Sequence, residues 1–116
     1  MPKRGERVAP PPAPGEWEIR YATSEAARGW EELCRNAPNS AAECWKALRK
    51  SPREAINPKR QFRLKGTLGT RVLRGQDLEQ WQYEVTGGGR VFYCPDAHSG
   101  IVWLTHAGTG HPKATE

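Results

Sequence analysis

One stretch of the 116-residue chain, LEQWQYEVTGGGRVFYC at positions 78–94, constrains its fold more than any other. Apolar and polar side chains alternate along it, the alternation stops at three consecutive glycines, and it then resumes. Alternation is typical of a strand with one buried face, and two such strands joined by a glycine turn predict an antiparallel hairpin. We therefore expect a sheet that buries one of its faces.

The length of the glycine loop decides which side chains share a face. A loop of all three glycines, 87–89, pairs Thr86 with Arg90, whereas a loop of two glycines would place Arg90 among the aromatic rings. Because burying an unpaired charge is costly, we predict the three-residue loop. The buried face then holds five apolar side chains: Trp81, Tyr83, Val85, Val91 and Tyr93. The opposite face holds Gln82, Glu84, Thr86, Arg90 and Phe92.

Two helices are predicted before this hairpin. Thr23 and Ser24 are candidate N-caps of a first helix, whose apolar residues recur at helical spacing up to residue 37. Ser40 and Glu43 have the spacing of a capping box for a second helix, which Pro52 ends. The short connection and the two apolar stripes predict an antiparallel helical hairpin packed on the sheet.

Strand-like segments lie on both sides of the helices. They are residues 17–21, 62–65, 78–86, 90–94 and 101–106, and residues 67–75 are either a short strand or an ordered loop. Short turns between the later segments predict antiparallel neighbours. The predicted class is α+β, with an N-terminal strand and an antiparallel helical hairpin packed on one face of a small antiparallel sheet. This domain spans residues 16–113, and the basic, proline-rich residues 1–15 are predicted to be a disordered arm.

Basic residues are concentrated in one part of the chain. The formal net charge is +5, and residues 49–76 contain nine basic residues and one acidic residue. Such a stripe is the footprint expected for a phosphate-rich partner, although an acidic protein partner or a solvated face gives the same pattern. Phe92 likewise has two interpretations, a platform on which a base stacks or a core residue under one of the chain ends.

Several classes of protein are disfavoured by composition. No apolar run approaches the roughly 18 residues of a membrane helix, and the start of the chain lacks the apolar core of a secretory signal, so we expect a cytoplasmic protein without a membrane partner. Three cysteines in such a chain do not predict a disulfide framework. The spacing of Cys94 and His98, with His106 and His111 farther on, matches a zinc site poorly, so we expect no metal or cofactor.

The chain resembles the RelE/ParE superfamily of toxins from bacterial type II toxin–antitoxin systems. The resemblance rests on the order β-α-α-β-β-β and on the segments LRKSP, RLKG, WQYEVTGGGRVFYCPD and VWLTHAGTGHPKAT, and it covers roughly residues 16–113. It implies one of two activities: metal-independent endoribonuclease cleavage of mRNA on the ribosome by 2′-hydroxyl attack, or ParE-like inhibition of DNA gyrase by binding. It also implies a cognate antitoxin, acidic in its toxin-binding half, with a helix over the basic groove. A non-catalytic phage or bacterial adaptor is a further alternative.

The resemblance also implies roles for individual residues. Arg90 matches the family arginine that begins the strand after the hairpin, and so is expected to stabilise the phosphate. The lysines of the preceding family strand fall at Gln82 and Glu84, neither of which supplies a cation. Glu84 is then either the general base or an ordinary strand glutamate paired with Arg90. His106 or His111 is the candidate general acid, or each is a histidine held by a backbone carbonyl.

The remaining expectations concern RNA binding and the last strand. The candidate RNA contacts are Arg63, Lys65, Arg71, Arg74, Gln82, Phe92 and Lys113. Simple alternation along residues 101–106 places Ile101 and Trp103 on one side and Val102, Leu104 and His106 on the other. It does not decide which of these sides faces the helices.

Overall fold

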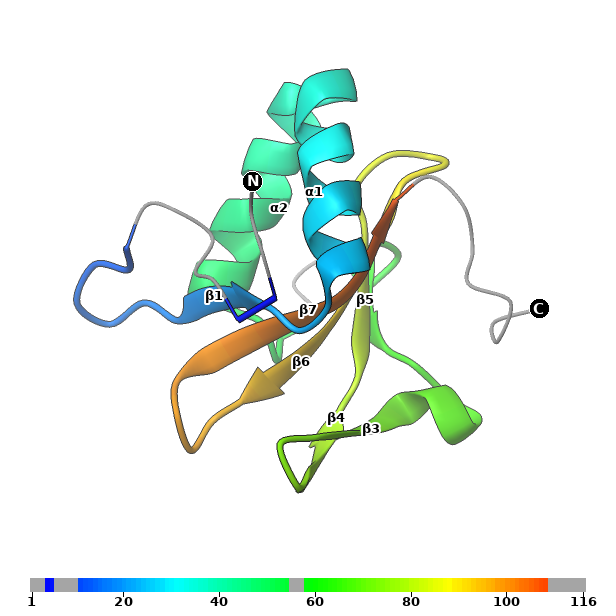
Figure 1. The fold of residues 1–116 in the computed structure, drawn as a ribbon. Helices are drawn as coiled ribbons and strands as arrows, with labels where there is room; N and C mark the ends of the chain where they lie inside the picture. Colours follow the sequence, from blue (N-terminus) through cyan, green and yellow to red (C-terminus); the bar gives the residue numbers. More distant parts are fainter. Residues whose placement is uncertain (1–3, 6–10, 55–57, 109–116) are drawn as a thin grey trace.

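The structure is a computed structural model that describes residues 4–5, 11–54 and 58–108. Within these ranges the chain forms two helices, a five-stranded mixed sheet and a separate two-stranded hairpin. The elements are β1 (Glu18–Tyr21), α1 (Ser24–Asn36), α2 (Pro38–Lys50), β2 (Gln61–Arg63), the 3-10 turn η1 (Gly66–Gly69), β3 (Thr70–Leu73), β4 (Gln76–Glu79), β5 (Trp81–Glu84), β6 (Arg90–Asp96) and β7 (Ile101–Gly108). Figure 1 shows both helices on one side of the sheet and the β3–β4 hairpin on the other.

The order of strands in the large sheet is β1-β7-β6-β5-β2. The α+β class and the helical hairpin on one face are confirmed, but the prediction of a wholly antiparallel sheet is wrong. β1 runs parallel to β7, with Tyr21 opposite Leu104. Parallel neighbours need a long connection between them, and here every other element of the domain lies between β1 and β7 in the chain.

The two helices begin differently. Thr23 caps α1 as predicted, because its hydroxyl accepts a hydrogen bond of 3.0 Å from the Ala26 amide. The capping box predicted at Ser40 is wrong, since α2 begins two residues earlier at Pro38. Proline suits the first turn of a helix, where its missing N–H would have had no partner.

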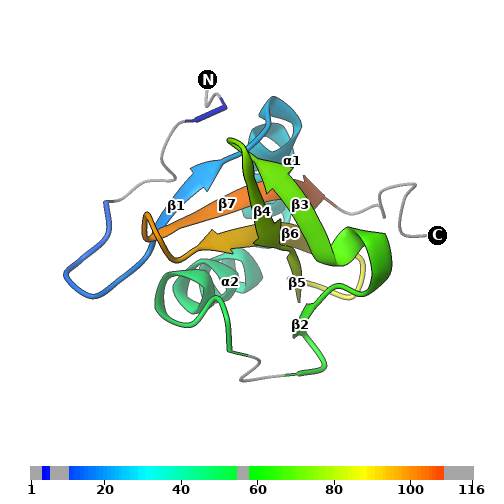
Figure 2. The same ribbon diagram turned by 90° about the horizontal axis from the view of Figure 1, so that it is seen from below.

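The strand predicted over residues 78–86 is divided at Gln80. The part before it, β4, pairs with β3 through a turn in which Arg74 and Gly75 have φ of 51° and 77°, as a tight two-residue hairpin turn requires. Gln80 lies outside the β3–β4 hairpin, and its backbone N–H donates to the Gly69 carbonyl at 3.0 Å. The hairpin therefore lies across the sheet face opposite the helices, as Figure 2 shows from below.

The hairpin of β5 and β6 has the predicted faces but a different register. Glu84 lies opposite Arg90, two residues from the predicted pairing of Thr86 with Arg90, and the loop is residues 85–89. The Thr86 hydroxyl closes this longer loop by accepting a hydrogen bond of 2.8 Å from the Gly89 amide. A shift of two residues preserves the alternation of side chains, so the division between the two faces stays as predicted.

The core lies between the helices and the sheet. It contains aromatic and branched side chains from both layers, among them Trp30, Leu33, Tyr83, Tyr93 and Leu104. Helix α1 approaches β7 very closely, because a Cβ added at Gly29 would lie 1.8 Å from the Ala107 carbonyl oxygen. This contact fixes the position of α1 over β7 and hence the position of its first residues.

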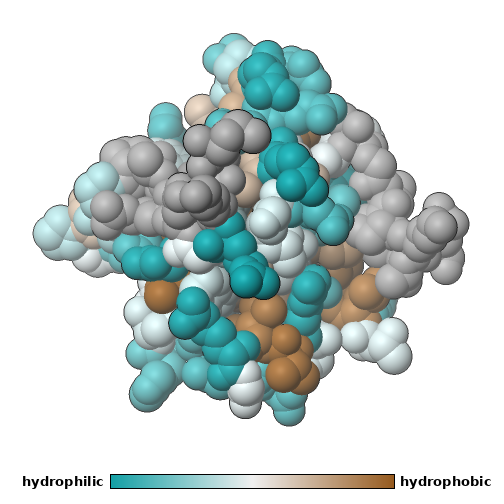
Figure 3. Space-filling model, in the orientation of Figure 1, coloured by the Kyte–Doolittle hydropathy of each residue, from teal (hydrophilic) through white to brown (hydrophobic). Residues whose placement is uncertain are grey.

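Figure 3 shows one face of the molecule, on which most of the described residues are hydrophilic and hydrophobic residues gather at the lower centre and lower right of the view. In the described ranges the exposed large hydrophobic side chains are Val72, at 64% exposure, and Phe62, at 36%. No helix in these ranges is long and apolar enough to cross a membrane.

Parts of the proline-rich N-terminal segment contact the domain. The Gly5 amide donates to the Tyr21 carbonyl at 2.8 Å, on the outer edge of β1. The buried Arg49 side chain donates to the Pro11 carbonyl at 2.9 Å and to the Glu16 carboxylate at 2.5 Å. The described residues of this segment therefore lie against β1 and the end of α2.

Candidate functional site

Two of the predicted catalytic residues are cross-strand neighbours on the sheet face opposite the helices. Glu84 ends β5 and Arg90 begins β6, and the two lie directly opposite each other. The Arg90 Nη1 atom is 3.9 Å from the Glu84 Oε2 atom, and both side chains are partly exposed to solvent. An ion pair at this distance and exposure contributes little to stability.

His106 is placed on the same face by a β-bulge. His106 lies opposite Phe92, but the next pair along the strands joins Leu104 to Tyr93, so Thr105 is an extra residue in β7. The extra residue reverses the alternation, and the prediction that His106 shares a side with Leu104 is wrong. The imidazole instead packs edge-on against the Phe92 ring, with centroids 5.4 Å apart.

A buried polar contact stabilises the bulge. The Thr105 hydroxyl donates to the Gln80 Oε1 atom at 2.6 Å, and the Gln80 Nε2 atom donates to the Leu68 carbonyl at 2.8 Å. Gln80 thereby joins β7 to the segment that precedes β3. Sequence reasoning missed both residues, because neither carries a motif and their partnership depends on the bulge.

His106 lines a cavity of about 270 Å³ between the hairpin and the start of α1. The other lining residues are Thr23, Glu25, Leu68, Arg71, Gln80, Phe92 and Thr105. An imidazole from β7 and a guanidinium from β3 therefore border the same space. Because Arg90 is two residues from Phe92 on β6, it is a diagonal neighbour of His106, at a Cα separation of roughly 7–8 Å.

Two predicted RNA contacts are buried. Phe92 is 3% exposed, which favours its interpretation as a core residue and leaves no free ring face for a base. The His106 ring packs against Phe92, and Phe92 borders the same cavity as Arg71 of the hairpin. The predicted cover by a chain end falls largely on residues outside the described ranges. Gln82, which lies opposite Phe92, is 8% exposed and is equally unsuited to contact a strand of RNA at the surface.

The predicted basic contacts are distributed around the hairpin. The Arg63 guanidinium donates to the Gly69 carbonyl at 3.2 Å and lies 3.7 Å from the Glu79 carboxylate. Lys65 and Arg71 are exposed, and Arg74 lies over the Trp103 ring. The candidates His111 and Lys113 lie outside the described residues.

The cysteines are poor candidates for chemistry. Burial raises the pKa of the Cys94 thiol to about 12, an effect that the positive charge of Arg71 opposes. Burial also raises the pKa of Cys44 well above its usual value. Both thiols stay protonated near neutral pH and are weak nucleophiles. Among the residues that the structure describes, no cluster of three or more His, Cys, Asp or Glu side chains is arranged to hold a metal ion.

The fold and site define a small α+β protein with a partly exposed sheet face that carries a carboxylate, a guanidinium and an imidazole. Neither the models of known protein families nor the curated proteins return a match to the chain.

Proposed function

We propose that the protein is the toxin of a type II toxin–antitoxin system of the RelE/ParE superfamily, and that it is a metal-independent endoribonuclease that cleaves mRNA on the ribosome. One observation carries the proposal: Glu84, Arg90 and His106 share the face opposite the helices, on three adjacent strands. The two consecutive helices that follow β1 and the concentrated basic charge of residues 49–76 support it.

The three side chains match the requirements of 2′-hydroxyl attack. The Glu84 carboxylate accepts the 2′-hydroxyl proton as the 2′-oxygen forms a bond to the adjacent phosphorus. The Arg90 guanidinium stabilises the negative charge of the phosphorane. His106, in its protonated form, donates a proton to the 5′-oxygen as the P–O5′ bond breaks. The products are a 2′,3′-cyclic phosphate and a 5′-hydroxyl end.

The arrangement of strands suits this division of roles. Arg90 lies on the central strand β6, with Glu84 on β5 at one side and His106 on β7 at the other. Two strand spacings and one two-residue step separate the Cα atoms of Glu84 and His106 by roughly 12 Å. A phosphate held by Arg90 therefore lies between the proposed base and the proposed acid. Arg71 supplies a further cation at the His106 cavity, whereas the positions of the family's strand lysines hold Gln82 and Glu84.

Mapping of mRNA ends after induction tests the proposal. Primer extension is expected to find new cut sites on translated messages. Arg90→Ala is expected to reduce the cleavage rate about 10²- to 10³-fold, and His106→Ala about 10²- to 10⁴-fold. Arg35→Ala, which removes an exposed arginine from the last turn of α1, is the matched control and is expected to leave cleavage unchanged. Growth arrest with intact messages would refute the proposal.

A second candidate is ParE-like inhibition of DNA gyrase by binding. The burial of Gln82 and Phe92 favours it, because fewer side chains of this face are then able to contact an RNA strand. Purified protein would in that case inhibit gyrase supercoiling while RNA stays intact. The same assay pair, run with wild-type protein and Arg90→Ala, separates the two activities.

The proposal includes a cognate antitoxin and a cytoplasmic site of action. The antitoxin is expected to lay an acidic helix over the basic groove beside the β3–β4 hairpin. Opposite charges on two partners increase the association rate, and the increase falls as salt is added. A salt-dependent association rate with an acidic protein encoded beside this one is therefore the expected signature.

A further inference from the structure

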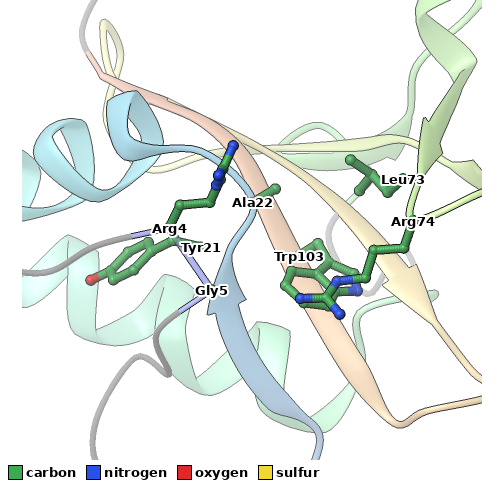
Figure 4. A pocket seen from close by; sticks show the side chains of 7 residues that line it. All are labelled: Arg4, Gly5, Tyr21, Ala22, Leu73, Arg74 and Trp103. Carbon is green, nitrogen blue, oxygen red and sulfur yellow. The ribbon is translucent and has the colours of Figure 1, made fainter.

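A second cavity, of about 370 Å³, lies on the Trp103 side of the β3–β4 hairpin (Figure 4). The lining residues are Arg4, Gly5, Tyr21, Ala22, Leu73, Arg74 and Trp103. Two of them carry positive charge and none carries negative charge. A cavity of this composition attracts an anion.

The two arginines come from distant parts of the chain and are held in different ways. Arg74 lies over the Trp103 ring, with its guanidinium carbon 4.7 Å from the ring centroid. Arg4 is positioned by its neighbour Gly5, whose amide donates to the Tyr21 carbonyl at 2.8 Å and whose carbonyl accepts from the Arg20 guanidinium at 2.8 Å. Figure 4 shows Arg4 and Arg74 on opposite sides of the opening.

The backbone at Arg74 gives no reason for an arginine there. Its φ of 51° lies in a region that favours glycine, asparagine or aspartate in a two-residue hairpin turn. The long side chain instead reaches over Trp103, where its planar guanidinium presents a fork of donors. Such a fork matches the oxygen atoms of a phosphate.

The Trp103 cavity and the His106 cavity are neighbours along one path. Each is bordered by the same three elements: the β3–β4 hairpin supplies Arg74 to the first and Arg71 to the second, and β7 supplies Trp103 and His106. The junction of β1 and α1 supplies Ala22 to the first and Thr23 to the second. Trp103 and His106 are three residues apart on β7, so their Cα atoms lie within roughly 10 Å of each other.

We infer that the Trp103 cavity binds a backbone phosphate of the RNA strand whose scissile phosphate lies at Arg90 and His106. This inference rests on the proposed function and extends it by assigning a substrate subsite. Arg74 and Arg4 hold the phosphate between them. An acidic segment of a protein is the alternative occupant. We favour RNA because a strand with its scissile phosphate at Arg90 has further phosphates along its backbone, and the Trp103 cavity lies next to that site.

Binding of a fluorescent, uncleavable 2′-O-methyl oligonucleotide, followed by anisotropy between about 50 and 200 mM salt, tests the inference without requiring cleavage. Arg74→Gln is expected to weaken binding about tenfold and to reduce the magnitude of the log–log salt slope by about 0.7, the contribution of one phosphate contact on a single strand. Arg4→Gln is expected to act in the same direction. Arg35→Gln, which removes the same charge, is the matched control and is expected to leave both the affinity and the salt slope unchanged.

Thermal unfolding of each variant, together with Arg74→Lys, separates binding from folding. Arg74→Lys keeps the charge but loses the fork, so it is expected to keep the salt slope and lose part of the affinity. The inference is overturned if Arg74→Gln folds and binds the oligonucleotide as tightly as the wild type. It is also overturned if binding of polyglutamate depends on Arg74 and binding of the oligonucleotide does not. If oligonucleotide binding depends on Arg74 but no RNA is cleaved, only the proposed endoribonuclease function is refuted. If cleavage depends on Arg90 but oligonucleotide binding does not depend on Arg74, only the subsite in the Trp103 cavity is refuted.

Discussion

Substitution of Gly29 by alanine sets two physical effects against each other. Alanine in a helix interior is favoured over glycine by about 1 kcal/mol, so helix propensity alone predicts a more stable protein. The packing of α1 on β7 predicts the reverse. The new Cβ would lie 1.8 Å from the Ala107 carbonyl oxygen and 2.6 Å from its carbonyl carbon. Both are backbone atoms, so no change of rotamer relieves the clash.

The size of the clash decides which effect wins. Restoring an ordinary carbon–oxygen contact of about 3.4 Å requires α1 and β7 to separate by roughly 1.5 Å, because packed interiors leave no slack. Such a movement loosens the contacts of Trp30 and Leu33 with the sheet. Overpacking costs about 1–3 kcal/mol and occasionally more, and a shift of a whole helix belongs at the upper end. We therefore expect a net destabilisation of about 2 kcal/mol and a fall in Tm of roughly 8 °C.

Urea unfolding of Gly29→Ala, compared with the wild type and with Arg28→Ala, measures this effect. Arg28 is the preceding residue of α1 and is exposed, so its substitution tests helix propensity without a clash. The midpoint of unfolding should fall for Gly29→Ala and stay within about 0.5 kcal/mol of the wild-type stability for Arg28→Ala. A Gly29→Ala protein as stable as the wild type, or more stable, would refute the close approach of α1 to β7.

Two further predictions concern buried side chains of β6, Tyr93 and Cys94. Tyr93→Phe removes a hydroxyl that donates to the Pro52 carbonyl and accepts from the Gln61 side chain, each at 2.9 Å. The free energy of unfolding, measured by chemical denaturation, should therefore fall by about 2–4 kcal/mol. A loss below about 1 kcal/mol would contradict this buried hydrogen-bond network. Burial raises the pKa of Cys94 from 9.0 to about 12, so the thiol loses its proton at a lower pH in the unfolded chain than in the folded protein. The free energy of unfolding should therefore decline as pH rises from about 9 toward 12, by up to about 1.4 kcal/mol per pH unit. Cys94→Ala should make that decline shallower, and an unchanged slope would argue against a buried thiol.

Much of the fold was predictable from local patterns. The Thr23 cap, the two helices and the division of the β5–β6 hairpin into two faces follow from side-chain chemistry and periodicity that act over a few residues. The face assignment survived a wrong register because the error was two residues, and an even shift leaves each side chain on its own face. An error of one residue would have placed Arg90 under the helices.

The features that were not predictable depend on contacts between distant parts of the chain. The parallel pairing of β1 with β7 and the departure of Gln80 from the strand pattern both follow from where other elements lie. The burial of Phe92 is of the same kind, since the hairpin that covers it is built from residues 70–79. Alternation along a segment indicates which side chains share a side, but it does not indicate what will cover that side.

The bulge at Thr105, which the sequence pattern did not predict, determines whether His106 belongs to the candidate site. Without it, continuous alternation would carry His106 to the side of Leu104, which is buried against the helices, and the imidazole would not share a face with Arg90. With it, the imidazole joins the face that carries Glu84 and Arg90. The bulge is held by Gln80, the residue at which the strand pattern breaks. The hairpin that departs at Gln80 also brings Arg71 to the His106 cavity, so a single interruption in the sequence pattern both positions the imidazole and supplies a cation beside it.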